Sequence, residues 1–315
     1  MNNPEFKLPA AQTYVFQNTG LFGPDSVSWK VWSHPAAFVG LMRSFIIEML
    51  NHPDGAAAVA QKGGYSRDPI GRLQRTMFYF LNVVFGDTAM VTAANERLER
   101  IHQRIEGTTS LTGRHYHAHD PMLMLGTHLI TWHSVYYAYE QFVGGLTPAE
   151  EAAFFKESKL AAEVMKLDAE AAKAYARDHH QFELGSMASM TGIPEDREAY
   201  RQIFEVFKQG YAVTPEARDV VSMLISPHQK DADMRKQVLF QGAKPLSMWA
   251  TLLVPRDMRR MAGLPTSLVW EKTLRVSGRA MVHTLAVPAV WRALQNEISP
   301  NGYALMRQAM ATATT

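Results

Sequence analysis

The sequence predicts an all-α protein in which roughly ten to twelve helices form a single domain. Apolar residues recur at helical spacing through most of the 315 residues, and several capping residues stand directly before a proline, a common helix start. Runs with strand-like alternation are rare and short. The hydrophobic content of 47% and the charged content of 20% are ordinary for a globular protein. We therefore expect one large helical core.

The composition excludes several kinds of site and partner. The net charge of +2 and the lack of a basic run argue against a nucleic-acid partner. The absence of cysteine excludes disulfides, thiolate zinc sites, iron–sulfur clusters and a cysteine nucleophile. Any metal must therefore be held by histidine, carboxylate, methionine or tyrosine. No signal peptide and no run of about 20 apolar residues is present, so we expect a soluble, cytoplasmic protein without an integral membrane segment.

The first long helices have clear boundaries in the sequence. Ser33 can cap a helix that runs to about Asn51, where His52-Pro53 ends it because the residue before proline avoids the α conformation. Asp68-Pro69 then pairs a cap with a proline at the first helical position, and opens a long helix that stops at Gly86.

The next predicted helix carries the histidine around which the site is expected to form. Asp87 caps this helix and Gly107 ends it. His102 lies on its apolar stripe and not among its charges. That stripe comprises Leu98, Ile101 and Ile105. A buried histidine needs a partner for each ring nitrogen, and the partner of His102 is either a backbone carbonyl or carboxylate, or a metal.

Further helix signals continue to the end of the chain. Asp120-Pro121 begins a helix that runs through Val143, and Thr147 with Glu150 forms a capping box. Further helices are predicted over 169–180, 194–209 and from Thr214-Pro215 to about 225, and 226–244 is predicted as a polar linker. The predicted organisation is an N-terminal extension over 1–32, a helical domain over 33–295 and a C-terminal tail over 296–315.

Two groups of polar residues precede His102 in the chain. Arg72, Arg75 and Thr76 share one helix face, which is either solvated or forms a basic, hydroxyl-bearing wall opposite His102. Glu48 and His52 are one turn apart. They form either an acid/base pair, or an unrelated acid and a histidine favoured by the dipole at the helix C-terminus.

The other histidines offer weaker metal sites. His128 and His133 are five residues apart, which is poorer than the i, i+4 spacing of a two-histidine zinc face. His115, His117 and His119 alternate in a predicted loop, where they either bind a divalent metal or are simply polar.

Six motifs together resemble a known family. In chain order they are HPxxxxxV (52–59), DPIGRLQRT (68–76), IHQRIEG (101–107), YHAHDPMLMLGTHLITWHS (116–134), YEQFVGGLTPAEEAAFF (139–155) and GIPED (192–196). Their order and spacing are similar to those of the haem-dependent oxygenases that include latex-clearing protein (rubber oxygenase) and the fungal enzyme that cleaves a farnesyl side chain in mycophenolic acid biosynthesis. The resemblance covers roughly residues 30 to 295.

The resemblance implies a helical domain that encloses haem b, with His102 as the iron ligand and His128 matching a second family histidine near the cofactor. It also implies O2 as a co-substrate, polarised by Arg72, Arg75 and Thr76, and an apolar, unsaturated, possibly isoprenoid substrate. Glu48 would remove an allylic proton, and the alkene would be cleaved to two carbonyls. Haem ligation by a lone histidine also suits a chain without cysteine.

The sequence departs from the family pattern at three positions. Rubber-cleaving members have lysine where this chain has Arg75, and arginine has no lone pair for iron. We therefore expect the side of the iron opposite His102 to be open or occupied by water. Gly126 replaces a usual tryptophan and His133 a usual acid, which leaves the substrate class open. A peroxidase-like enzyme with the same haem and an all-α carrier of an apolar ligand without iron remain alternatives, and the oligomeric state is left open.

Overall fold

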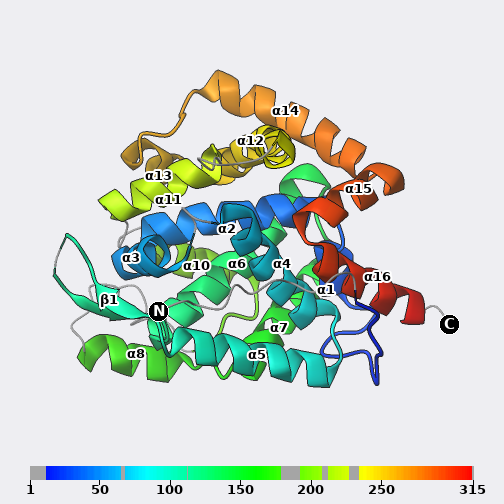
Figure 1. Ribbon diagram of the computed structural model, residues 1–315, viewed down its shortest axis with the longest axis horizontal. Coiled ribbons are helices and arrows are strands. Elements are labelled where there is room, and N and C mark those ends of the chain that lie inside the picture. The colour runs from blue at the N-terminus through cyan, green and yellow to red at the C-terminus, as the bar shows by residue number, and fades with distance from the viewer. Residues whose placement is uncertain are drawn as a thin grey trace.

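The computed structural model describes residues 12–64, 68–111, 113–178, 192–207, 212–226 and 234–313. These residues form fifteen helices and one two-stranded antiparallel hairpin, which confirms the predicted all-α class and single domain (Figure 1). The first half of the chain contains α1 (Val27–Trp32), α2 (Pro35–Asn51), α3 (Pro53–Lys62), α4 (Pro69–Phe85), α5 (Thr88–His102), β1 (Glu106–Thr108), β2 (His115–His117) and α6 (Pro121–Phe142). The second half contains α7 (Pro148–Val164), α8 (Ala169–Asp178), α10 (Arg197–Phe207), α11 (Pro215–Ile225), α12 (Met234–Leu253), α13 (Arg256–Met261), α14 (Leu268–Leu285), α15 (Pro288–Ile298) and α16 (Pro300–Ala313).

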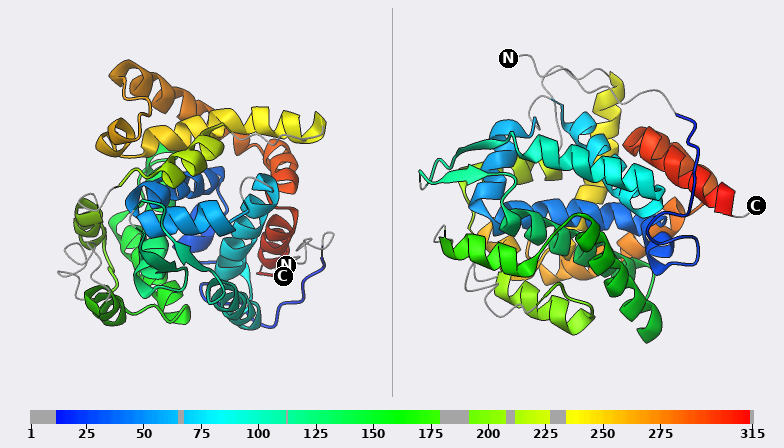
Figure 2. Two further views of the ribbon diagram at one scale, coloured as in Figure 1. Left: turned by 60° about the vertical axis from the view of Figure 1, so that its left-hand side comes forward. Right: turned by 90° about the horizontal axis from the view of Figure 1, so that it is seen from below.

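The α2–α6 pair forms the centre of the molecule. A Cβ atom on Gly40 of α2 would lie 2.6 Å from the Cα atom of Val135 on α6, so only glycine permits this crossing. The α12–α14 layer lies on one side of this pair, and α5 and α8 lie on the opposite side (Figures 1 and 2). α16 packs along α4 and completes the core.

Five of the predicted helix starts are confirmed. Each capping side chain accepts a hydrogen bond from a backbone N–H in the first turn of its helix, which satisfies a donor that has no partner within the helix. These caps are Asp68, Asp87, Asp120, Thr147 and Thr214.

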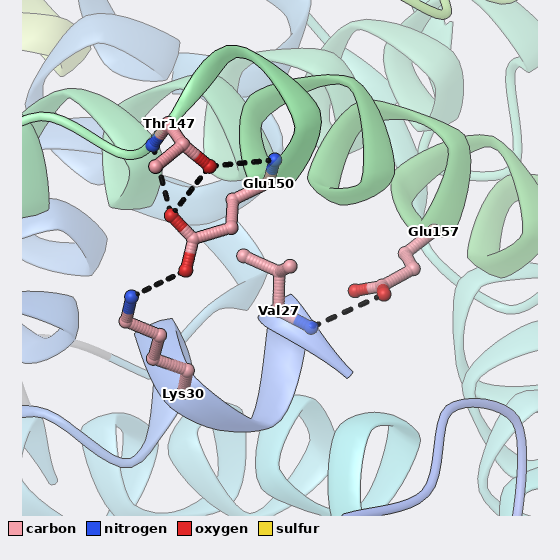
Figure 3. A network of polar contacts seen from close by, with 5 residues as sticks. All are labelled: Val27, Lys30, Thr147, Glu150 and Glu157. Atoms are coloured by element: carbon pink, nitrogen blue, oxygen red, sulfur yellow. Dashed lines mark hydrogen bonds and ion pairs between the residues drawn. The ribbon is translucent and has the colours of Figure 1, made fainter. Parts of the chain in front are cut away.

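The capping box that begins α7 also ties this helix to α1 (Figure 3). Glu150 bonds the backbone N–H and hydroxyl of Thr147, and its second oxygen lies 2.6 Å from the Lys30 ammonium. Glu157, two turns further along α7, accepts the backbone N–H groups of Val27 and Ser28. The Glu157 carboxylate thus caps the first turn of α1 and Glu150 pairs with its last turn, so both hold α1 against α7.

Three predicted boundaries are corrected. Ser33 ends α1, and the side chain of His34 caps α2 instead. The predicted linker over 226–244 is helical from Met234 onwards, because α12 continues through an internal proline. The helix that carries His102 ends at that residue and not at Gly107, which pairs with Tyr116 in the β1–β2 hairpin. The structure therefore places Gly107 in a close contact between two strands, and not at the end of a helix.

The ends of the predicted domain contribute to the core. α1 lies within the predicted N-terminal extension and buries Trp29, Val31 and Trp32. α16 lies within the predicted tail, and its Leu305 is fully inaccessible. The predicted helices over 169–180 and 194–209 correspond to α8 and α10, and 179–180 and 208–209 lie outside the described residues.

Within the described ranges, no helix combines the length and apolarity that crossing a membrane requires.

Candidate functional site

His102, the last residue of α5, is a partly buried and neutral imidazole. Burial, with smaller effects from the nearby charges of Arg72 and His119, lowers the pKa of His102 to about 4. Its Nδ1 lies 3.0 Å from the thioether sulfur of Met124 on α6. With the proton on Nδ1, facing this weak acceptor, the lone pair is on Nε2. His102 can therefore ligate a metal without first losing a proton.

Arg72 on α4 connects His102 to Glu48. The charge of Arg72 lowers the pKa of both residues, so its guanidinium lies near each of them. Three helices, α2, α4 and α5, therefore supply one carboxyl group, one guanidinium and one imidazole to the same region. Such a cluster can hold an anionic group beside a metal and can exchange a proton nearby.

Glu48 is a carboxyl group with an unusually high proton affinity. Burial raises its pKa to about 8, although hydrogen bonds from Thr131 and Ser44 and the charge of Arg72 act in the opposite direction. The Thr131 hydroxyl lies 3.3 Å from a carboxyl oxygen of Glu48. Glu48 is also the one residue of α2 that is not fully buried.

One face of α6 connects His102 and Glu48. Met124, Thr127 and Thr131 recur at i, i+3 and i+7, so they share this face. Met124 contacts His102 and Thr131 contacts Glu48, and Thr127 between them is exposed. This face therefore reaches the surface between the two contacts, although most of α6 is buried.

The other two residues predicted on α4 make local contacts. The Thr76 hydroxyl donates to the carbonyl oxygen of Arg72, 3.0 Å away, within its own helix. The Arg75 guanidinium lies 3.1 Å from the carboxylate of Asp68, the N-cap of α4, in a partly exposed ion pair. In this arrangement Arg72, and not Arg75, is the α4 cation beside His102.

His128 and His133 make contacts on other sides of α6. The Nε2 of His128 lies 3.0 Å from the carbonyl oxygen of Ser158 on α7, and the ring is fully buried. Burial lowers the pKa of His128 to about 4. The ring of His133 packs on Phe204 of α10 with 4.0 Å between centroids. His128 joins α6 to α7, and His133 joins α6 to α10.

The remaining predicted histidines are distributed around the hairpin. His52 caps α3 by accepting the backbone N–H of Asp54 at 3.2 Å. His115 is exposed beside Glu106, and His117 accepts the backbone N–H of His119. The described residues contain no group of three or more histidine, aspartate or glutamate side chains that could hold a metal. A haem needs only one such ligand from the protein, so His102 alone satisfies that requirement.

Sequence reasoning missed Met124, Thr131 and Ser44, which position His102 and Glu48. The spacing of Met124 and Thr131 shows that they share one face of α6, but it does not show that this face lies beside His102 and Glu48. Ser44 carried no signal, since a serine on a buried helix is most often bonded to its own backbone, as Ser44 is to Leu41.

A surface hollow lined by Pro288, Ala289, Arg292 and Ala293 includes no predicted site residue. Neither does a second hollow between Phe16–Thr19 and α16. The fit of the site to a haem is argued from its donor set: a neutral imidazole and an adjacent guanidinium.

The comparison with protein families decides the class. A family model described as "ER-bound oxygenase mpaB/B'/Rubber oxygenase, catalytic domain" matches residues 29–287. The chain belongs to this family. The matched range of this mpaB/rubber oxygenase domain includes α2, α4, α5 and α6, which carry the whole cluster. The chain is therefore an oxygenase-family enzyme. No curated protein and no solved structure matches it.

Proposed function

We propose that this protein is a haem b-dependent oxygenase that uses O2 on an apolar, unsaturated small molecule, with His102 as the iron ligand. One observation supports the proposal most strongly. A neutral, partly buried histidine, next to a guanidinium and a protonatable carboxyl group, lies inside a matched oxygenase catalytic domain. When bound, haem supplies the redox chemistry with O2, which no side chain of this chain can provide.

The chain's own residues would hold and orient the cofactor. Nε2 of His102 would ligate the iron, while the Met124 thioether at Nδ1 fixes the ring orientation. Arg72 would place a positive charge beside the cofactor, where it can pair with a propionate or polarise an oxygen atom. We propose that His128 has an indirect role: its bond to Ser158 holds α6 against α7 and so helps to position Met124 on α6.

Glu48 would move the proton. A base works best when its pKa lies near the working pH, and burial brings the pKa of Glu48 to about 8. Its carboxylate form would accept an allylic proton from the substrate, and the positive charge of Arg72 would favour this carboxylate form before the transfer. Thr131 and Ser44 hold the carboxyl group in one orientation. The roles predicted for Thr76 and Arg75 require each to leave its present local contact.

The experiment is a cofactor and turnover assay on protein produced with added iron and haem precursor. A pyridine haemochromogen assay should show about one haem b per chain. Oxygen consumption should then depend on an isoprenoid alkene, with carbonyl products. Turnover with hydrogen peroxide but not O2 would favour the peroxidase alternative. A folded protein that binds the alkene but takes up no haem would contradict the proposal and favour the carrier.

A further inference from the structure

α14 exposes apolar residues on a face where a globular protein normally places polar ones. Val269, Thr273, Val276 and Ala280 recur at i, i+4, i+7 and i+11, which aligns them along one face, and all four are exposed. The exposed fractions of Val269 and Val276 are 75% and 72%. The hydroxyl of Thr273 bonds the carbonyl oxygen of Val269 at 3.0 Å, so it needs no water. We call these four residues the α14 ridge.

A basic edge runs beside the α14 ridge. Lys272, Arg275 and Arg279 recur at i, i+3 and i+7 and are all exposed. The one acid of α14, Glu271, is turned inwards, where it lies 2.6 Å from the buried Arg259. The structure describes every α14 residue that carries a formal charge, and those that are exposed are all positive.

The residues around the α14 ridge add further exposed apolar and basic side chains. Trp270 and Leu268, each 55% exposed, lie at the start of the helix. The adjacent α13 and α15 expose the bases Arg260 and Arg292 against the acid Asp257. In Figures 1 and 2 α14 lies at the outer edge of the molecule, beyond α12, where a flat surface can reach it.

We infer that α14 is a docking surface for an anionic lipid bilayer. A helix that lies in the membrane interface combines an apolar face, a tryptophan near headgroup level and basic residues along its edge. The basic edge argues against a second copy of this chain, because symmetric pairing would bring the positive edges of both α14 helices together. The inference is independent of haem binding, and its failure would leave the proposed function intact.

Vesicle co-sedimentation tests the inference with the full-length protein. Vesicles containing about one third phosphatidylserine should bind the protein, and phosphatidylcholine vesicles should bind it at least about tenfold more weakly. Binding should weaken with salt, because the attraction of the basic edge is screened. The blue shift of tryptophan fluorescence on binding should decrease in Trp270→Phe.

Matched variants separate this role from a structural one. The double variant Val269→Glu/Val276→Glu should lose vesicle binding while keeping its circular dichroism, since both side chains are exposed. Val15→Glu, at a residue 79% exposed elsewhere, should bind like the wild type. Lys272→Gln/Arg275→Gln should lose most of the preference for anionic lipid. Absence of vesicle binding, or unchanged binding by the valine double variant, would overturn the inference. The inference would also be overturned if the protein does not bind vesicles but dimerises at higher concentration, or binds an acidic protein, and the valine double variant abolishes that association.

Discussion

The α2–α6 pair and the α4–α5 pair carry the candidate site between them, but they are packed in opposite ways. Every residue of α2 except Glu48 is buried, and a glycine lets its backbone touch α6. In α5, all of which is described, Val91 is the one fully buried residue. Ile101, predicted to lie on a buried stripe, is 44% exposed.

This difference in burial separates the residues of the candidate site into two groups. The carboxyl group and the residues that orient it, Glu48, Ser44 and Thr131, lie on the more buried pair. The proposed ligand His102 and the cation Arg72 lie on the less buried pair. A haem placed between the pairs would give α5 the apolar contact that the protein alone does not provide. The predictions below test whether the two pairs differ in this way.

The largest expected effect is at the α2–α6 crossing. Gly40→Ala places a methyl group 2.6 Å from a backbone atom of Val135, so the helices must separate. We expect a loss of about 3 kcal/mol in the free energy of unfolding, measured by urea denaturation. The control is Gly126→Ala on α6, where nothing lies within 4 Å of the added Cβ, and which should stabilise by roughly 0.5–1 kcal/mol. Equal effects at both glycines would show that the crossing is not tightly packed.

Side-chain truncation compares the two pairs directly. Leu41→Ala on α2 removes a fully buried side chain and should cost about 2–5 kcal/mol. Ile101→Ala on α5 should cost less than about 1 kcal/mol in the haem-free protein. If the isoleucine variant is as unstable as the leucine variant, α5 is packed as firmly as α2.

Stability should depend on pH through Glu48. Its pKa is about 8 when folded against 4.5 when unfolded, so the folded state binds the proton more tightly. This contribution is complete below pH 4.5 and is lost as pH rises to about 8. His102 and His128 act oppositely, and only below pH 6.5, because their folded pKa values are lowered. The fall in unfolding free energy between pH 6.5 and about 8 should therefore disappear in Glu48→Gln. An unchanged slope in that variant would place the titration elsewhere.

The smallest effect is expected at Arg75. Its ion pair with Asp68 is partly exposed, so Arg75→Ala should cost at most about 1 kcal/mol of stability. Haem content should stay near that of the wild type, whereas Arg72→Ala should lower the affinity for haem, as measured by haem titration. A large loss of haem from Arg75→Ala alone would place Arg75, and not Arg72, beside the cofactor.

Most of the fold could be predicted because its signals are local. A capping side chain fixes a helix start through a hydrogen bond to a backbone N–H two or three residues away, and the five starts with the caps named above were predicted. The end of α5 was missed because Gly107 serves a hairpin contact with Tyr116, which no local pattern shows. Within the site, His102, Arg72 and Glu48 were found from the resemblance and from helix faces. The contact of Met124 with Nδ1 of His102 could not be predicted from the sequence, because it depends on how α5 packs against α6.

The most direct test of the account is the haem spectrum of His102 variants. His102→Gly should lose most bound haem while keeping its helical circular dichroism, and added imidazole should restore haem binding and the Soret band. His128→Ala serves as the matched buried-histidine control and should keep a wild-type Soret position in the haem that it binds. A His102→Gly protein with full haem and an unchanged spectrum, beside a haem-free but folded His128→Ala protein, would contradict the assignment of His102 as the iron ligand.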